Sequence, residues 1–236
     1  MKFTSLALAA ALLFAGSAQA NEPLIRKALT QQFPGANIAS VQKTPYSGLF
    51  EVYLDGQLIY VDAKAQYVFA GKVIELKSGS NLTQARLNQL QAVKWDSLPL
   101  GNALKTVKGN GARKLAVFSD VDCPYCRKFE AELAKVDNIT VYTFLYPIEG
   151  LHPKAVQISK QIWCAPDRNK AWDEYIANGS VPKNDGKCSN PVDATIALGS
   201  KLRVEGTPTI FFENGQRVPG MVPAAQLERL FATNAK

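Results

Sequence analysis

The chain has 236 residues, a formal net charge of +7 at pH 7 and four cysteines. This length suits one large domain or two small ones, with enough chain for a sizeable core. The basic residues are scattered and their densest cluster is the pair Arg26-Lys27, so the charge argues against a nucleic-acid partner.

The first twenty residues have the pattern of a secretory signal peptide. Lys2 precedes an apolar run over residues 6–14, and small residues end at Ala20. The apolar run is about half the roughly 20 residues that a membrane-spanning helix needs. We therefore expect residues 1–20 to be cleaved after export to an oxidising compartment, where paired cysteines oxidise unless something keeps them reduced.

The next sixty residues predict a small α+β unit, which we assign to residues 21–80. An amphipathic helix is predicted over residues 21–33, and Asp55-Gly56 is a hairpin signal between two strands. So short a unit is marginal by itself because it buries a modest fraction of its surface, and dimerisation is one remedy. Runs of aliphatic and aromatic residues predict strands at 49–54, 57–61 and 67–76.

Residues 81–108 are predicted to form a linker helix and hinge, because Ser78-Gly79-Ser80 breaks the strand pattern and leucines then recur among polar residues. The second domain is expected over residues 109–236. Its first segments are a strand at 115–119, a helix from about 123 to 135 and a strand at 139–145. This succession implies a parallel crossover and an α/β sheet.

The rest of the second domain is predicted to be mainly helical. Residues 153–202 have a helical pattern with a turn-rich interruption at 182–191. A strand at 209–213, a hairpin turn at Asn214-Gly215 and a helix at 223–233 complete the chain.

Cys123 and Cys126 are two residues apart where the first strand of this domain meets its helix. Covalent haem attachment needs a histidine after the second cysteine, and Arg127 occupies that position. A purely structural bridge would close a loop too short to stabilise the fold much. A zinc site made with Cys164 and Cys188 remains an alternative, although the oxidising compartment competes for the thiols and the second pair lacks short ligand spacing.

Thiol–disulfide exchange fits the position of the pair better. Cys123 lies at a predicted helix N-terminus, where free N–H groups and the helix dipole favour an anion, and we expect Asp122 to cap that helix. A lowered pKa would make Cys123, within reach of a foreign chain, a good leaving group. Cys126, one turn later and more buried, would resolve mixed disulfides. Pro124 suits the first helical turn, and Tyr125 would offer an exposed ring to a substrate.

The order of these features resembles a known fold and family. A CxxC pair at a strand-to-helix junction, an inserted run of helices and then Thr207-Pro208 before a strand, hairpin and final helix resemble a thioredoxin fold with its cis-proline loop. With the signal peptide, the small domain and the linker helix, the whole chain resembles the bacterial periplasmic disulfide isomerases of the DsbC/DsbG family. The resemblance implies an α+β N-terminal cystatin-like dimerisation domain, joined by a linker helix to an α/β thioredoxin-fold domain with a helical insertion.

The same resemblance implies an activity without cofactor or metal. Cys123 would attack incorrect disulfides of misfolded exported proteins and Cys126 would resolve the mixed disulfide. Thr207 and cis-Pro208, together with Pro124-Tyr125, would contact the substrate beside the sulfurs. The resemblance also implies a V-shaped homodimer with an uncharged cleft that holds misfolded or unfolded chains, and a membrane thiol reductase of the DsbD type that would keep the pair reduced. A monomeric oxidase and a holdase chaperone with secondary thiol chemistry are the alternatives.

Two features point to different branches of the family. Pro124 before Tyr125 is similar to DsbG, whereas DsbC usually carries Gly-Tyr. The pair Cys164 and Cys188 is similar to a structural disulfide of DsbC that DsbG lacks, and we favour DsbC because a whole disulfide is harder to acquire than one residue. Without the resemblance, a bridge there would close a loop of about 25 residues and add roughly 3.5 kcal/mol; a second redox pair is the alternative. His152 is expected to be an ordinary loop residue.

Overall fold

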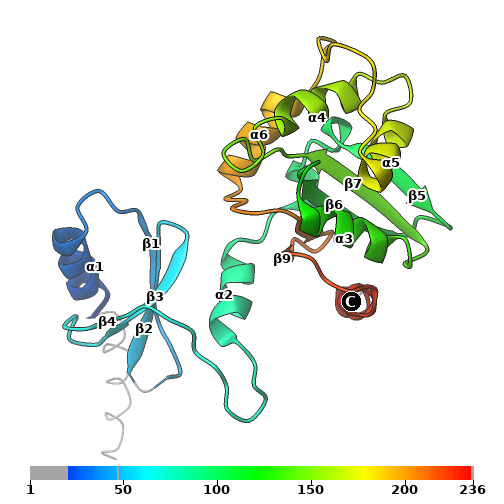
Figure 1. Ribbon diagram of the computed structural model, residues 1–236. Coiled ribbons are helices and arrows are strands. Elements are labelled where there is room, and N and C mark those ends of the chain that lie inside the picture. The colour runs from blue at the N-terminus through cyan, green and yellow to red at the C-terminus, as the bar shows by residue number, and fades with distance from the viewer. Residues whose placement is uncertain (1–20, 47, 235–236) are drawn as a thin grey trace, which may run out of the picture. The chain divides into compact units, whose positions relative to one another are not determined.

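The computed structural model describes residues 21–46 and 48–234, so the predicted signal peptide lies outside the described residues. The chain divides into two compact units between Leu87 and Asn88, within helix α2 (Leu82–Leu90), and each unit is described by itself (Figure 1). Within the described ranges, no helix has the length and apolar character needed to cross a membrane.

The first unit is one helix and a four-stranded antiparallel sheet in the order β1-β2-β3-β4 (Figure 1). Ile25 and Leu29 form the buried face of the helix and pack against Val41, Phe50 and Val52 of the sheet. Burial of this apolar stripe is what holds so short a helix in place. The elements are α1 (Asn21–Gln32), β1 (Ile38–Lys43), β2 (Leu49–Leu54), β3 (Gln57–Asp62) and β4 (Val68–Phe69).

The strand predicted over residues 67–76 is wrong in its length. Only Val68 and Phe69 form a strand, opposite Tyr60 and Val61 of β3, and Ile74 makes an isolated bridge. A strand needs a partner for its backbone groups, and β3 offers one over two residues only. The apolar residues of this segment are left exposed instead.

The second unit contains a five-stranded mixed sheet in the order β5-β7-β6-β8-β9. Strands β6 and β7 run parallel, joined by helix α3 (Pro124–Leu133), as the sequence predicts, and the other neighbours are antiparallel. The edge strand β5 falls within residues 81–108, which the sequence assigns to the linker, so the second unit begins before residue 109. The strands are β5 (Leu104–Lys108), β6 (Arg113–Ser119), β7 (Ile139–Leu145), β8 (Thr209–Phe212) and β9 (Arg217–Pro219).

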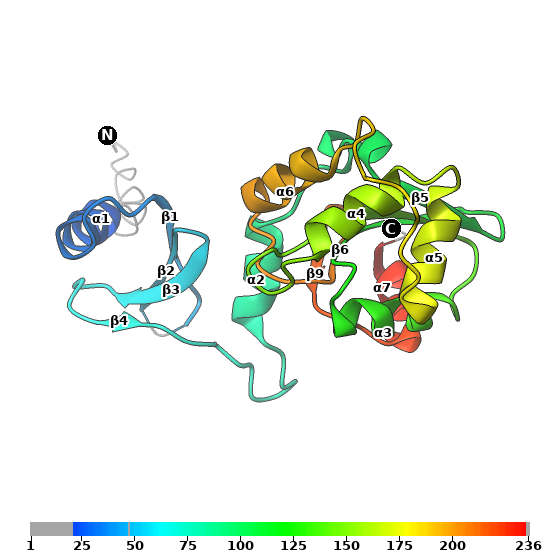
Figure 2. The ribbon, with the colours of Figure 1, turned by 45° about the horizontal axis from the view of Figure 1, so that its top comes forward.

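Five helices and two short 3-10 turns cover this sheet, and the predicted helical insertion consists of α4, α5 and α6 between β7 and β8. Alternate side chains of β6 face opposite sides: Leu115 and Val117 pack with α3 and α7, whereas Ala116 and Phe118 form a second cluster that α6 joins. Figure 2 shows α3 and α7 below β6 and α6 above it. The helices are η1 (Trp95–Ser97), η2 (Leu100–Asn102), α3 (Pro124–Leu133), α4 (Ala155–Trp163), α5 (Arg168–Asn178), α6 (Val192–Lys201) and α7 (Ala224–Asn234).

Cys164 and Cys188 form the disulfide that the sequence predicts, with 5.7 Å between their Cα atoms. Cys164 is the C-cap residue of α4, and Cys188 lies in the turn-rich segment before α6. The bond therefore ties the loop between α5 and α6 to the C-terminal end of α4. It also removes two of the four cysteines that the alternative zinc site would require.

Candidate active site

Cys123 and Cys126 lie at the start of helix α3, directly after the buried strand β6. Cys123 is the N-cap residue, Pro124 is the first helical residue, and both cysteines are free thiols. The N–H of Cys123 donates to the backbone carbonyl of Asp120 (3.2 Å), which closes the turn out of the strand. The turn thus delivers one sulfur to the helix N-terminus and the other one turn into the helix.

The prediction that Asp122 caps this helix is wrong. The Asp122 carboxylate accepts a hydrogen bond from the Tyr175 hydroxyl of α5 instead, and no side chain makes the cap bond at Cys123. The backbone N–H groups of Tyr125 and Cys126, to which a capping oxygen would have bonded, stabilise the Cys123 sulfur instead, and the Cys126 N–H also donates to the Cys123 carbonyl (3.1 Å). The helix end therefore acts on the thiolate.

The two thiols have opposite acidities. A hydrogen bond from the Cys126 thiol is the largest of the effects that lower the pKa of Cys123 to about 5; burial opposes it, and the Thr207 side chain and the N–H groups of Cys126 and Tyr125 assist it. The same hydrogen bond raises the pKa of Cys126, and burial raises it further. At neutral pH Cys123 is the thiolate and Cys126 keeps its proton.

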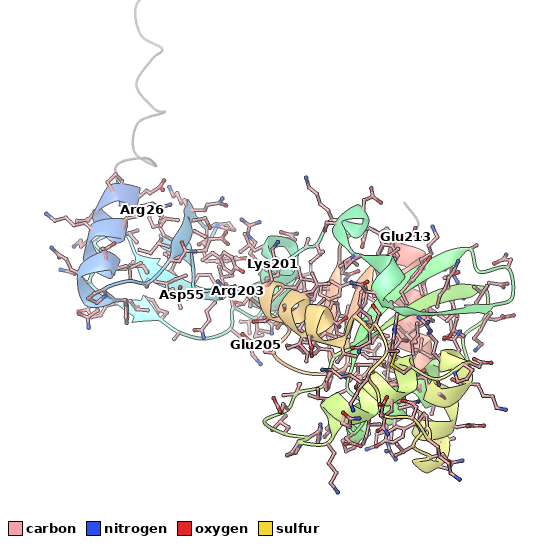
Figure 3. All side chains as sticks on the ribbon, turned by 90° about the horizontal axis from the view of Figure 1, so that it is seen from above. Arg26, Asp55, Lys201, Arg203, Glu205 and Glu213 are labelled. Carbon is pink, nitrogen blue, oxygen red and sulfur yellow. A yellow bond between two sulfur atoms is a disulfide. The ribbon has the colours of Figure 1, made fainter. Side chains whose placement is uncertain are left out.

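The loop before β8 closes over this sulfur. The Thr207-Pro208 peptide bond is cis, and the Cys123 sulfur lies 3.3 Å from the carbonyl oxygen of Thr207. Thr207 acts on the thiol in two directions, because its carbonyl accepts from the protonated thiol whereas its side chain stabilises the thiolate. The segment leading to this loop exposes Lys201, Arg203 and Glu205 to solvent (Figure 3).

Cys123 is less open than the sequence analysis expects. Only 6% of the residue is exposed, against 0% for Cys126, so the order of burial agrees with the expectation but the attacking sulfur does not lie free at the surface. The contact with Thr207 accounts for part of this cover. Exposed groups do flank it: Pro124 is exposed, and Tyr125, at 60%, presents its ring to solvent as expected.

Asp120 and His152 are functional candidates that the sequence analysis missed or set aside. Asp120 is fully buried; its carboxylate accepts the N–H of Asp122 (2.9 Å) and of Ile148 (2.7 Å) and bonds Nδ1 of His152 (2.9 Å). The Asp120 hydrogen bond raises the pKa of His152. His152 lies in a loop, as expected, and its bond to a buried carboxylate is a feature that the sequence analysis does not reveal. The available signal was that both residues follow the carboxyl ends of neighbouring parallel strands, which meet at one edge of a sheet.

Tyr175 and Arg127 complete the surroundings of the turn. Burial and the hydrogen bond to Asp122 raise the pKa of Tyr175 to about 12, so its hydroxyl remains a donor at all physiological pH values. The Arg127 guanidinium lies over the Tyr175 ring, 5.5 Å from the centroid. The Asp122 carboxylate therefore accepts from the Tyr175 hydroxyl, and the Arg127 cation lies over the Tyr175 ring.

Comparisons with known proteins agree with this arrangement. Residues 16–84 match the family described as the disulfide bond isomerase protein N-terminal domain, and residues 100–235 match the thioredoxin-like domain. The probable thiol:disulfide interchange protein DsbC of Bordetella pertussis is 42% identical over 215 residues, which cover 90% of this chain and 76% of that protein. The thiol:disulfide interchange protein DsbC of Escherichia coli K12 is 29% identical, with 100% of this chain and 96% of that protein covered.

A solved structure matches more than half of the chain. The crystal structure of a disulfide interchange protein from Neisseria gonorrhoeae shares 44% sequence identity and superposes with a TM-score of 0.55. The match covers 58% of this chain and 98% of that one.

Proposed function

The chain belongs to the DsbC family of thiol:disulfide interchange proteins, and from this premise we propose that Cys123 is its attacking thiol and Cys126 its resolving thiol. The observation that carries the proposal is the asymmetry of the pair. Cys123, with its pKa lowered to about 5, sits at the helix N-terminus, whereas Cys126 is fully buried with its pKa raised. A thiolate is the nucleophile in disulfide exchange, so only one of the two is ready to attack.

The isomerisation is redox-neutral. The Cys123 thiolate attacks one sulfur of an incorrect substrate disulfide; a Cys123–substrate bond forms, the substrate S–S bond breaks, and the second substrate sulfur leaves as a thiolate. That thiolate exchanges with other disulfides of the same substrate until a substrate thiolate displaces Cys123. If the substrate stalls, Cys126 gives up its proton and attacks Cys123, which releases reduced substrate and leaves an internal disulfide that a thiol reductant must reopen.

Substrate contacts are proposed at Thr207, Pro208, Pro124 and Tyr125. Thr207 supports this role because its carbonyl already contacts the Cys123 sulfur, so a peptide bound along this loop would lie beside the reacting atoms. The exposed ring of Tyr125, two residues after Cys123, offers apolar contact area to a substrate. Because Cys123 is nearly buried, the substrate disulfide has to enter between these groups.

The N-terminal domain, residues 21–80, is proposed to join two copies, with the part of residues 81–108 that precedes β5 as the connection to the catalytic domain. Strand β4 supports this, because it is a two-residue edge strand with exposed Val68 and Phe69, followed by exposed apolar residues up to Leu76. An exposed apolar sheet edge is a template for pairing with another chain. A second copy of the same chain would cover it.

We also place the protein in the periplasm, with exported disulfide-containing proteins as substrates and a membrane thiol reductase of the DsbD type as electron donor. The predicted signal peptide supports export, and the Cys164–Cys188 disulfide suits an oxidising compartment. In such a compartment the free thiols at Cys123 and Cys126 need a reductant to stay free.

The test is recovery of activity from a scrambled multi-disulfide substrate. Reduced protein in catalytic amounts should restore activity well above glutathione alone, Cys123→Ala should abolish this, and Cys126→Ala should accumulate mixed disulfide. Reduced wild-type protein that does no better than glutathione contradicts the proposal.

The two alternatives make different forecasts. An oxidase would rest with the Cys123–Cys126 bond closed in cells, which alkylation of free thiols in the living cell detects, whereas an isomerase rests with the pair reduced. A holdase would suppress aggregation equally well with both residues replaced by Ala.

A further inference from the structure

Two carboxylates flank the reactive turn, and both disfavour a thiolate there. Asp122 directly precedes Cys123, and Asp120 lies three residues before it, with its backbone carbonyl accepting the Cys123 N–H. A like charge close to an acid raises the pKa of that acid. Hydrogen bonds make the Cys123 thiol acidic, and compensation of the two carboxylate charges would favour its thiolate further.

The carboxylates have different partners. Asp122 accepts from Tyr175, behind which lies Arg127. Asp120 is completely buried, and of its three hydrogen-bond partners only His152 can carry a positive charge. Burial of a carboxylate without a neighbouring cation costs free energy. A histidine that bonds the carboxylate through Nδ1 can reduce this cost by remaining protonated.

We propose that His152 is a positioning residue of the thiol pair: as an imidazolium bonded to Asp120, it cancels the buried carboxylate charge beside Cys123, so that the thiolate forms next to a neutral ion pair. The inference rests on the proposed role of Cys123 as attacking thiol. The groups that act on the His152 ring are Asp120, Asp122 and Cys123, all from the turn between β6 and α3. The ring is 25% exposed, so it exchanges its proton with solvent while Asp120 does not reach water.

Linkage makes the coupling reciprocal. If the protonated imidazole favours the Cys123 thiolate, the thiolate must favour the protonated imidazole by the same amount. The pKa of His152 should therefore be higher in the reduced protein than in the protein with a Cys123–Cys126 disulfide. His152 is the only histidine of the chain, so its ring signals in an NMR titration need no assignment.

The first experiment titrates this histidine in wild-type protein in both redox states. The expected result is a pKa higher by about half a unit in the reduced form, the size of a screened interaction between partly buried charges. Equal pKa values in the two forms would overturn the inference. The scrambled-substrate assay of the same protein reports separately on whether Cys123 attacks disulfides.

The second experiment measures the pH dependence of Cys123 alkylation in variants. His152→Gln keeps a donor for Asp120 but removes the charge, and should raise the midpoint by about half a unit, a roughly threefold loss of thiolate below it. Asp120→Asn together with His152→Gln removes both charges and should bring the midpoint back to that of the wild type. A purely structural role for His152 gives no such recovery.

Lys154→Gln is the matched control, because Lys154 is an exposed cation two residues further along the same loop. It should leave the midpoint unchanged. A His152→Gln midpoint equal to that of the wild type, or a double variant shifted further than the single one, would contradict the proposal.

Discussion

The sulfur of Cys123 lies 3.3 Å from the backbone carbonyl oxygen of Thr207, a residue 84 positions later in the chain. The contact brings the cis-proline loop onto the helix N-terminus, so that one residue covers the nucleophile and also helps to lower its pKa. Because the Thr207 carbonyl and side chain have opposite effects on the thiol, a change confined to the side chain separates them.

Thr207→Val should raise the pKa of Cys123 above its value of about 5. The substitution keeps the shape of the side chain but removes the hydroxyl that stabilises the thiolate. Thr207→Ser retains the hydroxyl and should stay close to the wild type. Ultraviolet absorbance of the thiolate across pH measures this shift, and a Val variant that titrates with the wild type would show that the hydroxyl has no part in it.

Removal of the Cys164–Cys188 disulfide by Ser substitution at both positions should destabilise the second unit by about 3.5 kcal/mol, since the bond closes a segment with a sequence separation of 24 residues. Urea unfolding followed by tryptophan fluorescence measures the change. Cys123 alkylation should keep its pH midpoint, because neither residue contacts the turn. A decrease of less than about 1 kcal/mol in the free energy of unfolding would contradict the expectation that this bond restricts the unfolded chain.

Glu130 makes the stability of the second unit depend on pH. Burial, followed by the nearby Asp173, raises the pKa of Glu130 to about 7. The residue as a whole is partly exposed, but its Oε1 is buried without a hydrogen-bond partner among the described residues, and burial of the carboxylate is what decides the shift. The folded state therefore binds this proton more tightly than the unfolded state does. That stability is complete below about pH 4.5 and is lost as pH rises through 7.

Glu130→Gln removes this dependence, so the variant should gain stability relative to the wild type between pH 5 and pH 8, by up to about 3 kcal/mol. Urea unfolding at the two pH values measures the difference. Glu174→Gln, at an exposed position of α5, is the control and should follow the wild type. A Glu130→Gln difference that is the same at both pH values would argue that the carboxyl titrates normally.

Phe69→Glu should convert the proposed dimer into monomers, because it places a charge on the exposed edge strand β4. Val107→Glu is the matched control, since Val107 is an exposed apolar residue on β5, the edge strand of the other sheet. Sedimentation velocity distinguishes the two outcomes. A Phe69→Glu protein that sediments with the wild type would place the dimer contact elsewhere or leave the chain monomeric.

Much of the second unit could be predicted from sequence because its core strands are short apolar runs between clear turn signals. β7 was predicted with its observed ends, and the parallel pairing of β6 and β7 followed from the helix between them. Two edge strands were missed: β1 buries only Val41, and β5 alternates too weakly to stand out from a linker. Whether such segments form strands depends on pairing with a neighbouring strand, and that strand can be distant in sequence.

The candidate site divides in the same way. The cysteine pair and Thr207-Pro208 were found because their spacing and local context carry the signal. Asp122 is a residue type that commonly caps helices, but only the fold shows that its carboxylate accepts a hydrogen bond from the Tyr175 hydroxyl of α5 instead. The pairing of Asp120 with His152 joins two loops 32 residues apart, so no local pattern announces it.

The pH dependence of Cys123 alkylation shows whether a hydrogen bond from Cys126 holds Cys123 as a thiolate. In reduced wild-type protein, with the modified residue identified by mass spectrometry, we expect a rate midpoint at about pH 5 and a much higher midpoint after Cys126→Ala, which removes the principal hydrogen bond to the thiolate. A wild-type midpoint near 8.5, the value of an ordinary cysteine, would contradict it.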